Sequence, residues 1–179
     1  YGLYFAGYET VYEGKNLMNL QLAAANMQDY IKGKVYSALP FSIAITIIMS
    51  IVILVLNFSF WPLLPAVFLA MPFLTLASGA ISANAAAMGG DFRADRMITR
   101  QRGSSVQMPI RGWSILRAQF VPMIFGAGGT LGIVIAGLLN PIYAYMVLPV
   151  FMLISWVLFR HYTKSAGISL AKIEATEYL

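Results

Sequence analysis

The sequence predicts an all-α, polytopic membrane helix bundle with an amphipathic cytoplasmic helix before the first complete span. Of the 179 residues, 59% are hydrophobic and only 11% are charged, which is far from the balance of a soluble globular domain. Several apolar runs reach the roughly 20 residues that a helix needs to cross a bilayer core of about 30 Å. The run "FSIAITIIMSIVILVL" is apolar on every side, whereas strands of a membrane barrel alternate between apolar and polar residues.

Two segments precede the first complete span. Residues 1–12 resemble the end of a membrane helix whose beginning is missing. Residues 13–36 repeat apolar side chains at steps of three and four, which predicts an amphipathic helix along the membrane face. An anchor in membrane lipid and a docking element for a partner both fit this pattern. The apolar stripe consists of Leu17, Leu20, Ala24, Met27, Ile31 and Val35.

Residues 37–160 are expected to form four spans in two hairpins. The turn "NFSFW" closes the first hairpin, and Asn140-Pro141 closes the second. A basic loop, residues 88–117, joins the hairpins, and a polar tail, residues 161–179, follows the last span. The predicted spans cover residues 38–57, 60–86, 118–139 and 141–159.

The basic residues predict the orientation. All twelve lysines and arginines lie before the first span, between the hairpins or after the last span, and neither short turn has one. By the positive-inside rule, the basic segments and the C-terminal tail are cytoplasmic in a multi-pass protein of the cell membrane. Because this bias explains the net charge of +5, we expect no nucleic-acid partner.

The predicted spans contain no Asp, Glu, Lys, Arg or His. This disfavours ion-coupled transport, because such transporters usually keep an ionisable group inside the membrane. No polar stripe runs the length of a span, so a stand-alone channel ranks third, after the two functions described below. Small residues repeat every four positions, and such stripes let helices approach closely, either within the chain or at a subunit interface. The candidate packing residues are Ser78, Ser82, Gly128, Gly132 and Ala136.

We expect no enzyme activity, no cofactor and no metal site. The chain has no cysteine, which excludes thiolate chemistry and cysteine-ligated metals. His161 lies at a membrane boundary, a position typical of an interfacial residue. Asp91 and Asp95 are one helical turn apart, but the flanking arginines favour a balanced surface over a cation site. The chain also lacks the GxxxxGK[ST] loop that binds ATP phosphates.

The stretch from Glu13 to Lys34 resembles the permease subunits of type-two ATP-binding-cassette exporters. An "EGK" is followed by an amphipathic stretch and by a "GK" at the mouth of the next span, and the order of turns, spans and basic loop is also similar. Family members often have a proline in the middle of the stretch, where this chain has "AANM". The matching residues are Glu13, Gly14, Lys15, Leu17, Leu20, Ile31, Gly33 and Lys34.

The resemblance implies a cytoplasmic coupling helix that docks onto a separate ATPase subunit. It also implies a second permease copy or homologous half as partner, and export of a lipid-like, amphiphilic or hydrophobic substrate. The alternative is a structural or accessory subunit of a larger membrane complex, whose amphipathic helix only lies on membrane lipid. The residues expected to contact the ATPase are Glu13, Lys15, Leu17, Leu20, Met27, Ile31 and Lys34.

Overall fold

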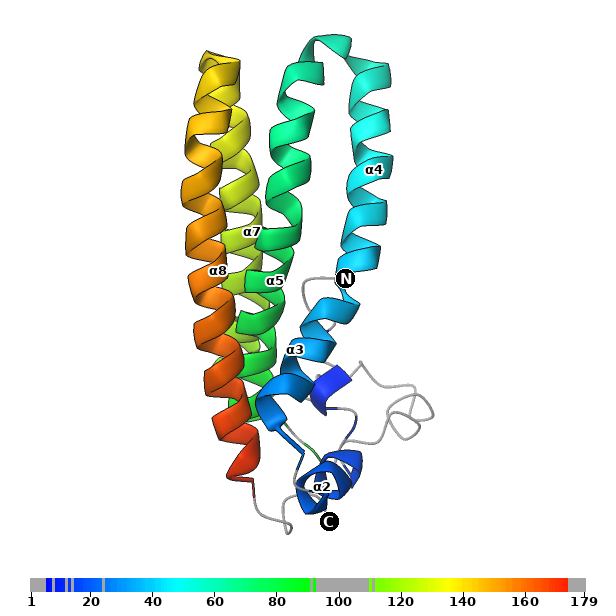
Figure 1. The fold of residues 1–179 in the computed structure, drawn as a ribbon, viewed down its shortest axis with the longest axis vertical. Helices are drawn as coiled ribbons and strands as arrows, with labels where there is room; N and C mark the ends of the chain where they lie inside the picture. The colour runs from blue at the N-terminus through cyan, green and yellow to red at the C-terminus, as the bar shows by residue number, and fades with distance from the viewer. Residues whose placement is uncertain are drawn as a thin grey trace.

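Helices dominate the structure, a computed structural model that describes residues 6–7, 9–11, 13, 15–23, 25–90, 92, 110 and 112–173. Four helical stretches in this part of the chain are long and apolar enough to cross a membrane. Figure 1 shows them as an elongated bundle, and the predicted all-α fold class is confirmed. The elements are α2 (Lys15–Leu22), α3 (Met27–Ser37), α4 (Leu39–Leu56), the 3-10 helix η1 (Phe58–Leu63), α5 (Leu64–Gly89), α7 (Trp113–Leu139) and α8 (Pro141–Ala171).

Two hairpins, α4 with α5 and α7 with α8, turn at the same end of the bundle (Figure 1). The side chains of Asn57 and Asn140 each accept a hydrogen bond, at 3.0 Å, from the backbone N–H two residues further on. Asparagine suits this position because its side-chain oxygen satisfies an N–H that the first helical turn leaves free. The Tyr145 hydroxyl donates to the Pro62 carbonyl oxygen at 2.8 Å and joins the two hairpin tips. We call this the turn end.

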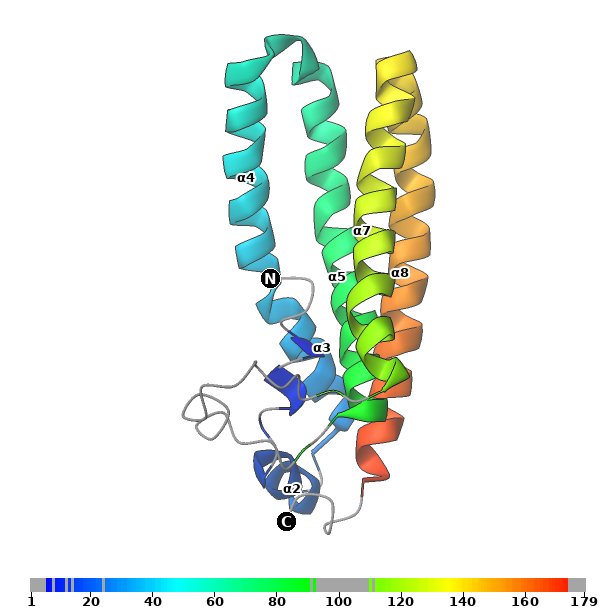
Figure 2. The same cartoon turned by 180° about the vertical axis from the view of Figure 1, so that it is seen from behind.

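The opposite end, which we call the basic end, carries α3, the start of α7 and the last turns of α8 (Figure 2). Most of the predicted basic loop, residues 88–117, lies outside the described residues. An isolated antiparallel bridge between Gly90 and Ile110 brings the two ends of that loop together. The basic residues of these three helices are Lys32, Lys34, Arg117, Arg160 and Lys164.

The second half of α5 forms the core of the basic end, and every residue from 74 to 87 is buried. Most of these residues are Ala, Ser or Gly, which lets neighbouring helices approach the backbone. A Cβ atom on Gly79 would lie only 3.1 Å from a methyl carbon of Val35 in α3. Residues 6–7 and 9–11, the described part of the first segment, are helical, and Ala6, Thr10 and Val11 are completely buried.

The first hairpin is looser than the second. Thr46 is the one buried residue of α4, and most of the apolar side chains of this helix are exposed. The Ser42 and Thr75 hydroxyl oxygens lie 2.6 Å apart and connect α4 to α5 near the middle of α5. An apolar helix with this exposure is suited to contact with lipid.

The last helix differs from the expectation. The sequence predicted a span ending at residue 159 and a separate polar tail at 161–179, but α8 continues without a break to Ala171. Buried residues recur along the extension at steps of three and four, so one face stays packed while the opposite face turns polar. Residues 174–179 lie outside the described residues. The buried residues of the extension are Thr163, Ala166, Gly167 and Leu170.

Candidate functional site

The candidate site is the group of elements at the basic end that consists of α2, α3 and residues 163–171 of α8. We call it the basic-end cap. The sequence predicted one continuous helix over residues 13–36, and the structure corrects this to two helices. Asn26 begins the second one: its Oδ1 accepts from the backbone N–H of Gln28 at 3.0 Å, and its Nδ2 donates to Asp29 at 2.8 Å. This capping ends the continuity of the helix, because the Asn26 backbone is extended.

The apolar stripe of the cap faces inward. Leu17, Met27 and Ile31 are 0 to 6% exposed, and Leu20 is half-buried against the same core. Val35 continues the stripe and packs against α5. Side chains this deeply buried cannot form a contact surface, so the expectation that Leu17, Met27 and Ile31 touch a partner is corrected. They hold α2 and α3 on the bundle instead, as hydrophobic burial favours.

Two contacts lock the cap to α8. The Gln21 side chain of α2 donates to the Leu170 carbonyl oxygen at 2.6 Å. A Cβ atom on Gly167 would lie 2.8 Å from both the backbone N and the Cα of Gln28, so α3 and α8 nearly touch backbone to backbone. These contacts were not predicted from the sequence. One pattern in the sequence could have indicated a close helix contact here. Two small residues, Ala166 and Gly167, precede Ile168 and continue the helical spacing of the last span.

The charged residues of the predicted contact set pair with each other. The Glu13 carboxylate accepts hydrogen bonds from the Lys34 ammonium and from the Tyr30 hydroxyl. The ammonium also lies 5.7 Å from the centre of the Tyr30 ring. The Lys34 and Glu13 side chains remain 20% and 26% exposed. The main partners of Glu13 and Lys34 are therefore within the chain, where they tie the residue before Gly14 and α2 to α3.

Lys15 is the first residue of α2, and its side chain lies outside the described part of the chain.

The outer face of the cap is polar and open. On α2, Asn16 and Asn19 are exposed, and Leu22 projects with 78% of its surface exposed. On α3, Lys32 and Asp29 form an exposed ion pair of 2.7 Å. A shallow hollow of about 530 Å³ lies on the same helix. Its lining residues are Asp29, Tyr30, Gly33, Lys34 and Ser37.

The predicted packing residues divide into two groups. Ser78 and Ser82 are buried in α5, and the Ser78 hydroxyl donates to the Pro122 carbonyl oxygen of α7 at 3.3 Å. Gly128, in contrast, is exposed, and a Cβ atom there would meet nothing within 4 Å. Gly128 therefore makes no close contact with another helix of the described chain, and its packing at a subunit interface stays a prediction.

The packed stripe of α7 is displaced from the predicted one. Gly132 and Ala136 are only half-buried. A Cβ on Gly132 would lie 3.2 Å from the Phe151 ring, whereas one on Gly129 would lie 2.7 Å from Leu74 of α5. The stripe that contacts α5 is therefore one position further along the chain. Its buried residues are Gly129, Ile133 and Gly137.

Potential metal ligands are not clustered among the described residues. In this part of the chain, no three His, Cys, Asp or Glu side chains lie close enough to hold a metal ion. His161 is exposed and lies edge-on to the Tyr162 ring, with 5.2 Å between ring centres. No protein-family model, curated protein or solved structure matches this chain.

Proposed function

We propose that the chain is a membrane-spanning permease subunit of an ATP-driven exporter and that the outer face of the basic-end cap docks a separate ATPase subunit. The observation that carries the proposal is the cap itself: a polar surface held rigidly at one end of an apolar bundle. The resemblance of residues 13–34 to type-two exporter permeases supports the same function. Four helices free of charged residues over most of their length suit a lipid-like, amphiphilic or hydrophobic substrate.

The cap is connected so that its movement reaches both hairpins. Ala38 alone separates α3 from α4, and its backbone is close to helical, with φ −79° and ψ −17°. At the other side of the cap, Gln21 and Gln28 contact α8 through Leu170 and Gly167. A partner that displaces the cap therefore acts on α4 through Ala38 and on α8 through these contacts. Coupling of this kind requires that the partner bind two arrangements of the bundle with different affinity.

The docking surface differs from the one that the sequence predicted. Because the apolar stripe is buried, the exposed contacts are the Asn16 and Asn19 amides, the projecting Leu22 side chain and the hollow of α3. Leu22 adds exposed apolar area, which binding to a partner would remove from water. Lys34 contributes to docking as a lining residue of that hollow, and Glu13 contributes only through its ion pair with Lys34.

A cross-linking experiment tests the docking surface. Because the 179 residues contain no cysteine, the variant Asn19→Cys carries a single thiol on the outer face of α2. Ser59→Cys is the matched control, since Ser59 is exposed at the turn end. With the complex isolated from membranes, we expect a bifunctional maleimide to join the Asn19→Cys variant to an ATPase and to leave the Ser59→Cys variant unlinked. An active complex with no cross-link at position 19 contradicts the proposal.

The same variants test which side of the membrane the cap faces. The positive-inside rule places the basic end in the cytoplasm. In intact cells, a membrane-impermeant maleimide is then expected to label Ser59→Cys and to label Asn19→Cys only after the cells are opened. Labelling of Asn19→Cys in intact cells would put the cap outside and exclude a cytoplasmic ATPase.

One observation favours the alternative, a structural or accessory subunit. α4 exposes a long apolar surface that neighbouring membrane helices of a larger complex would cover. In the exporter proposal, a second permease copy or homologous half and membrane lipid cover it. Isolation under mild conditions separates the two functions: an ATPase in fixed proportion supports the permease, and a set of other membrane subunits without an ATPase supports the accessory role.

A further inference from the structure

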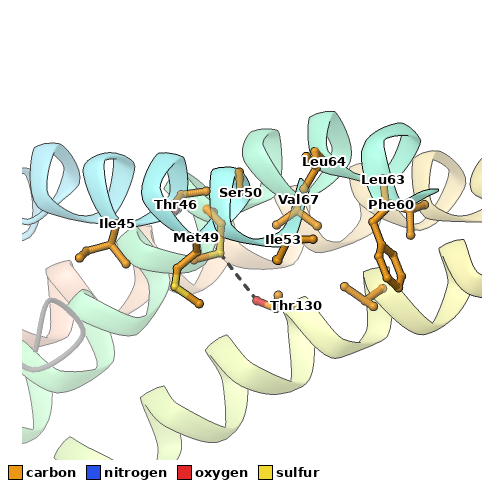
Figure 3. A pocket seen from close by; sticks show the side chains of 12 residues that line it. Ile45, Thr46, Met49, Ser50, Ile53, Phe60, Leu63, Leu64, Val67 and Thr130 are labelled. Carbon is orange, nitrogen blue, oxygen red and sulfur yellow. Dashed lines mark hydrogen bonds between the residues drawn. The ribbon is translucent and has the colours of Figure 1, made fainter. Parts of the chain in front are cut away.

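A cavity of about 430 Å³ lies between the two hairpins, on the turn-end side of the bundle (Figure 3). Its walls come from α4, η1, α5 and α7. α4 contacts α5 at the Ser42–Thr75 pair and is joined to it at the other end by η1, and Thr130 and Val134 of α7 complete the lining of the cavity between them. Its volume is within the range of about 300 to 1,000 Å³ found for ligand pockets.

The wall of the cavity is apolar and offers few free polar atoms. None of its lining residues is charged. The Thr46 hydroxyl donates to the Ser42 carbonyl oxygen of its own helix at 2.8 Å. The Thr130 hydroxyl donates to the Gly126 carbonyl oxygen at 2.8 Å and lies 3.7 Å from the Met71 sulfur. A dashed line in Figure 3 runs from Thr130 to a sulfur atom. Both threonine donors are used within the protein, and Ser50 carries the one other hydroxyl among the lining side chains, so the wall offers little to a polar or charged ligand.

We propose that this cavity binds one hydrocarbon chain of a membrane phospholipid. Water is a poor occupant, since a buried water needs two to four polar partners that this wall does not supply. An empty space of this size would deprive its lining of dispersion contacts. The thioethers of Met49 and Met71 are flexible and suit contact with a mobile aliphatic chain.

The position of the cavity fits a chain that enters from the bilayer. Along α4 it extends from Ile45 to Ile53, about 12 Å at 1.5 Å per residue. The hydrocarbon of one leaflet is about 15 Å thick, half of the bilayer core. Ile45 and Met49 line the cavity and are still 44% and 52% exposed, so the cavity is open towards the lipid around α4. This site does not depend on the proposed function, because it needs no ATPase.

Photolabelling of the purified protein tests the site. The probe is a phosphatidylcholine with a diazirine on its acyl chain, titrated into the protein in detergent, with labelled peptides identified by mass spectrometry. We expect saturable labelling of the peptides that contain Met49 and Met71. Unlabelled phosphatidylcholine should compete with it. On the exposed face of α8, near Leu153, we expect labelling that rises in proportion to the probe.

Paired variants show whether the cavity is responsible. Val134→Trp fills the cavity from α7 and should remove the saturable labelling, whereas Ile135→Trp places the same side chain on the neighbouring exposed position and should keep it. Val67→Phe is a smaller filling change on α5 for use if the tryptophan prevents folding. As a second readout, added phosphatidylcholine should raise the melting temperature of the Ile135→Trp variant and not that of the filled variants.

Three results would overturn the proposal. The first is labelling at Met49 and Met71 that does not saturate. The second is saturable labelling that survives both filling variants. The third is protection of these methionines by a cross-link between two copies of the chain, which would show that a protein helix occupies the cavity.

Discussion

Replacing Gly167 by alanine tests how tightly the basic-end cap is joined to the last helix. The new Cβ would lie 2.8 Å from the backbone N and Cα of Gln28 and 3.0 Å from its Cβ. Ordinary van der Waals contact begins near 3.4 Å. The obstacle is mostly backbone, which cannot rotate away as a side chain does, so α3 and α8 must separate by several tenths of an ångström.

The magnitude follows from two opposing effects. Alanine stabilises a helix interior by about 1 kcal/mol relative to glycine. Overpacking of a well-packed contact costs about 1 to 3 kcal/mol. We therefore expect Gly167→Ala to lower the free energy of unfolding by about 0 to 2 kcal/mol. Gly33→Ala is the matched control in α3: its Cβ meets nothing within 4 Å, so only the gain of about 1 kcal/mol remains.

Thermal unfolding of the two variants in the same detergent provides the measurement. A domain of this size shifts its melting temperature by about 2 to 4 °C per kcal/mol, so the Gly167 variant should melt roughly 2 to 12 °C below the Gly33 variant. If Gly167→Ala melts as high as Gly33→Ala, the close approach of α3 and α8 is refuted. The proposal that movement of the cap reaches α8 through a rigid contact would then have no structural basis.

Four further substitutions test the bundle by its melting temperature. Gly128→Ala should melt higher than Gly129→Ala, because only the second methyl group meets a neighbouring helix; the reverse order would restore the stripe that the sequence predicted. Ser155→Ala should leave stability unchanged or raise it by up to about 1 kcal/mol, since the described residues give its buried hydroxyl no partner; a clear loss would reveal a bound water. Tyr145→Phe should cost about 0.5 to 1 kcal/mol by removing its bond to Pro62, and no change would show that the hairpin tips are independent.

The helices and turns of the bundle were predictable because local signals specify them. The apolar run that ends before Asn57 lies entirely within α4, and the predicted and observed turns both lie at Asn57 and at Asn140. An asparagine that caps the next helix is a local signal, readable without knowledge of the neighbours. The amphipathic stripe of α3 was also predicted, since the spacing of Met27 and Ile31 does not depend on what covers them.

The partners of those helices were not predictable. Periodicity identifies an apolar face but not its neighbour, and the stripe of α2 and α3 faces α5 and α8 within the same chain. In α7, Gly128 and Gly129 are adjacent, and both belong to repeats of small residues. Which of them meets α5 depends on how the helix is rotated about its axis, and this is set by bulky neighbours such as Leu74. The break before Met27 was missed because Asn26 also suits the polar face of one continuous helix.

The two hairpins differ in a way that connects both proposals. The α7–α8 hairpin packs closely on α5, so these three helices are suited to move as one body. α4 has one buried residue, yet it follows the cap directly through Ala38. A displacement of the cap therefore meets least resistance in α4, because few contacts must break there. Movement of α4 would change the width of the cavity that it shares with α7, so the bound hydrocarbon chain and the docked ATPase would act on the same helix from opposite ends.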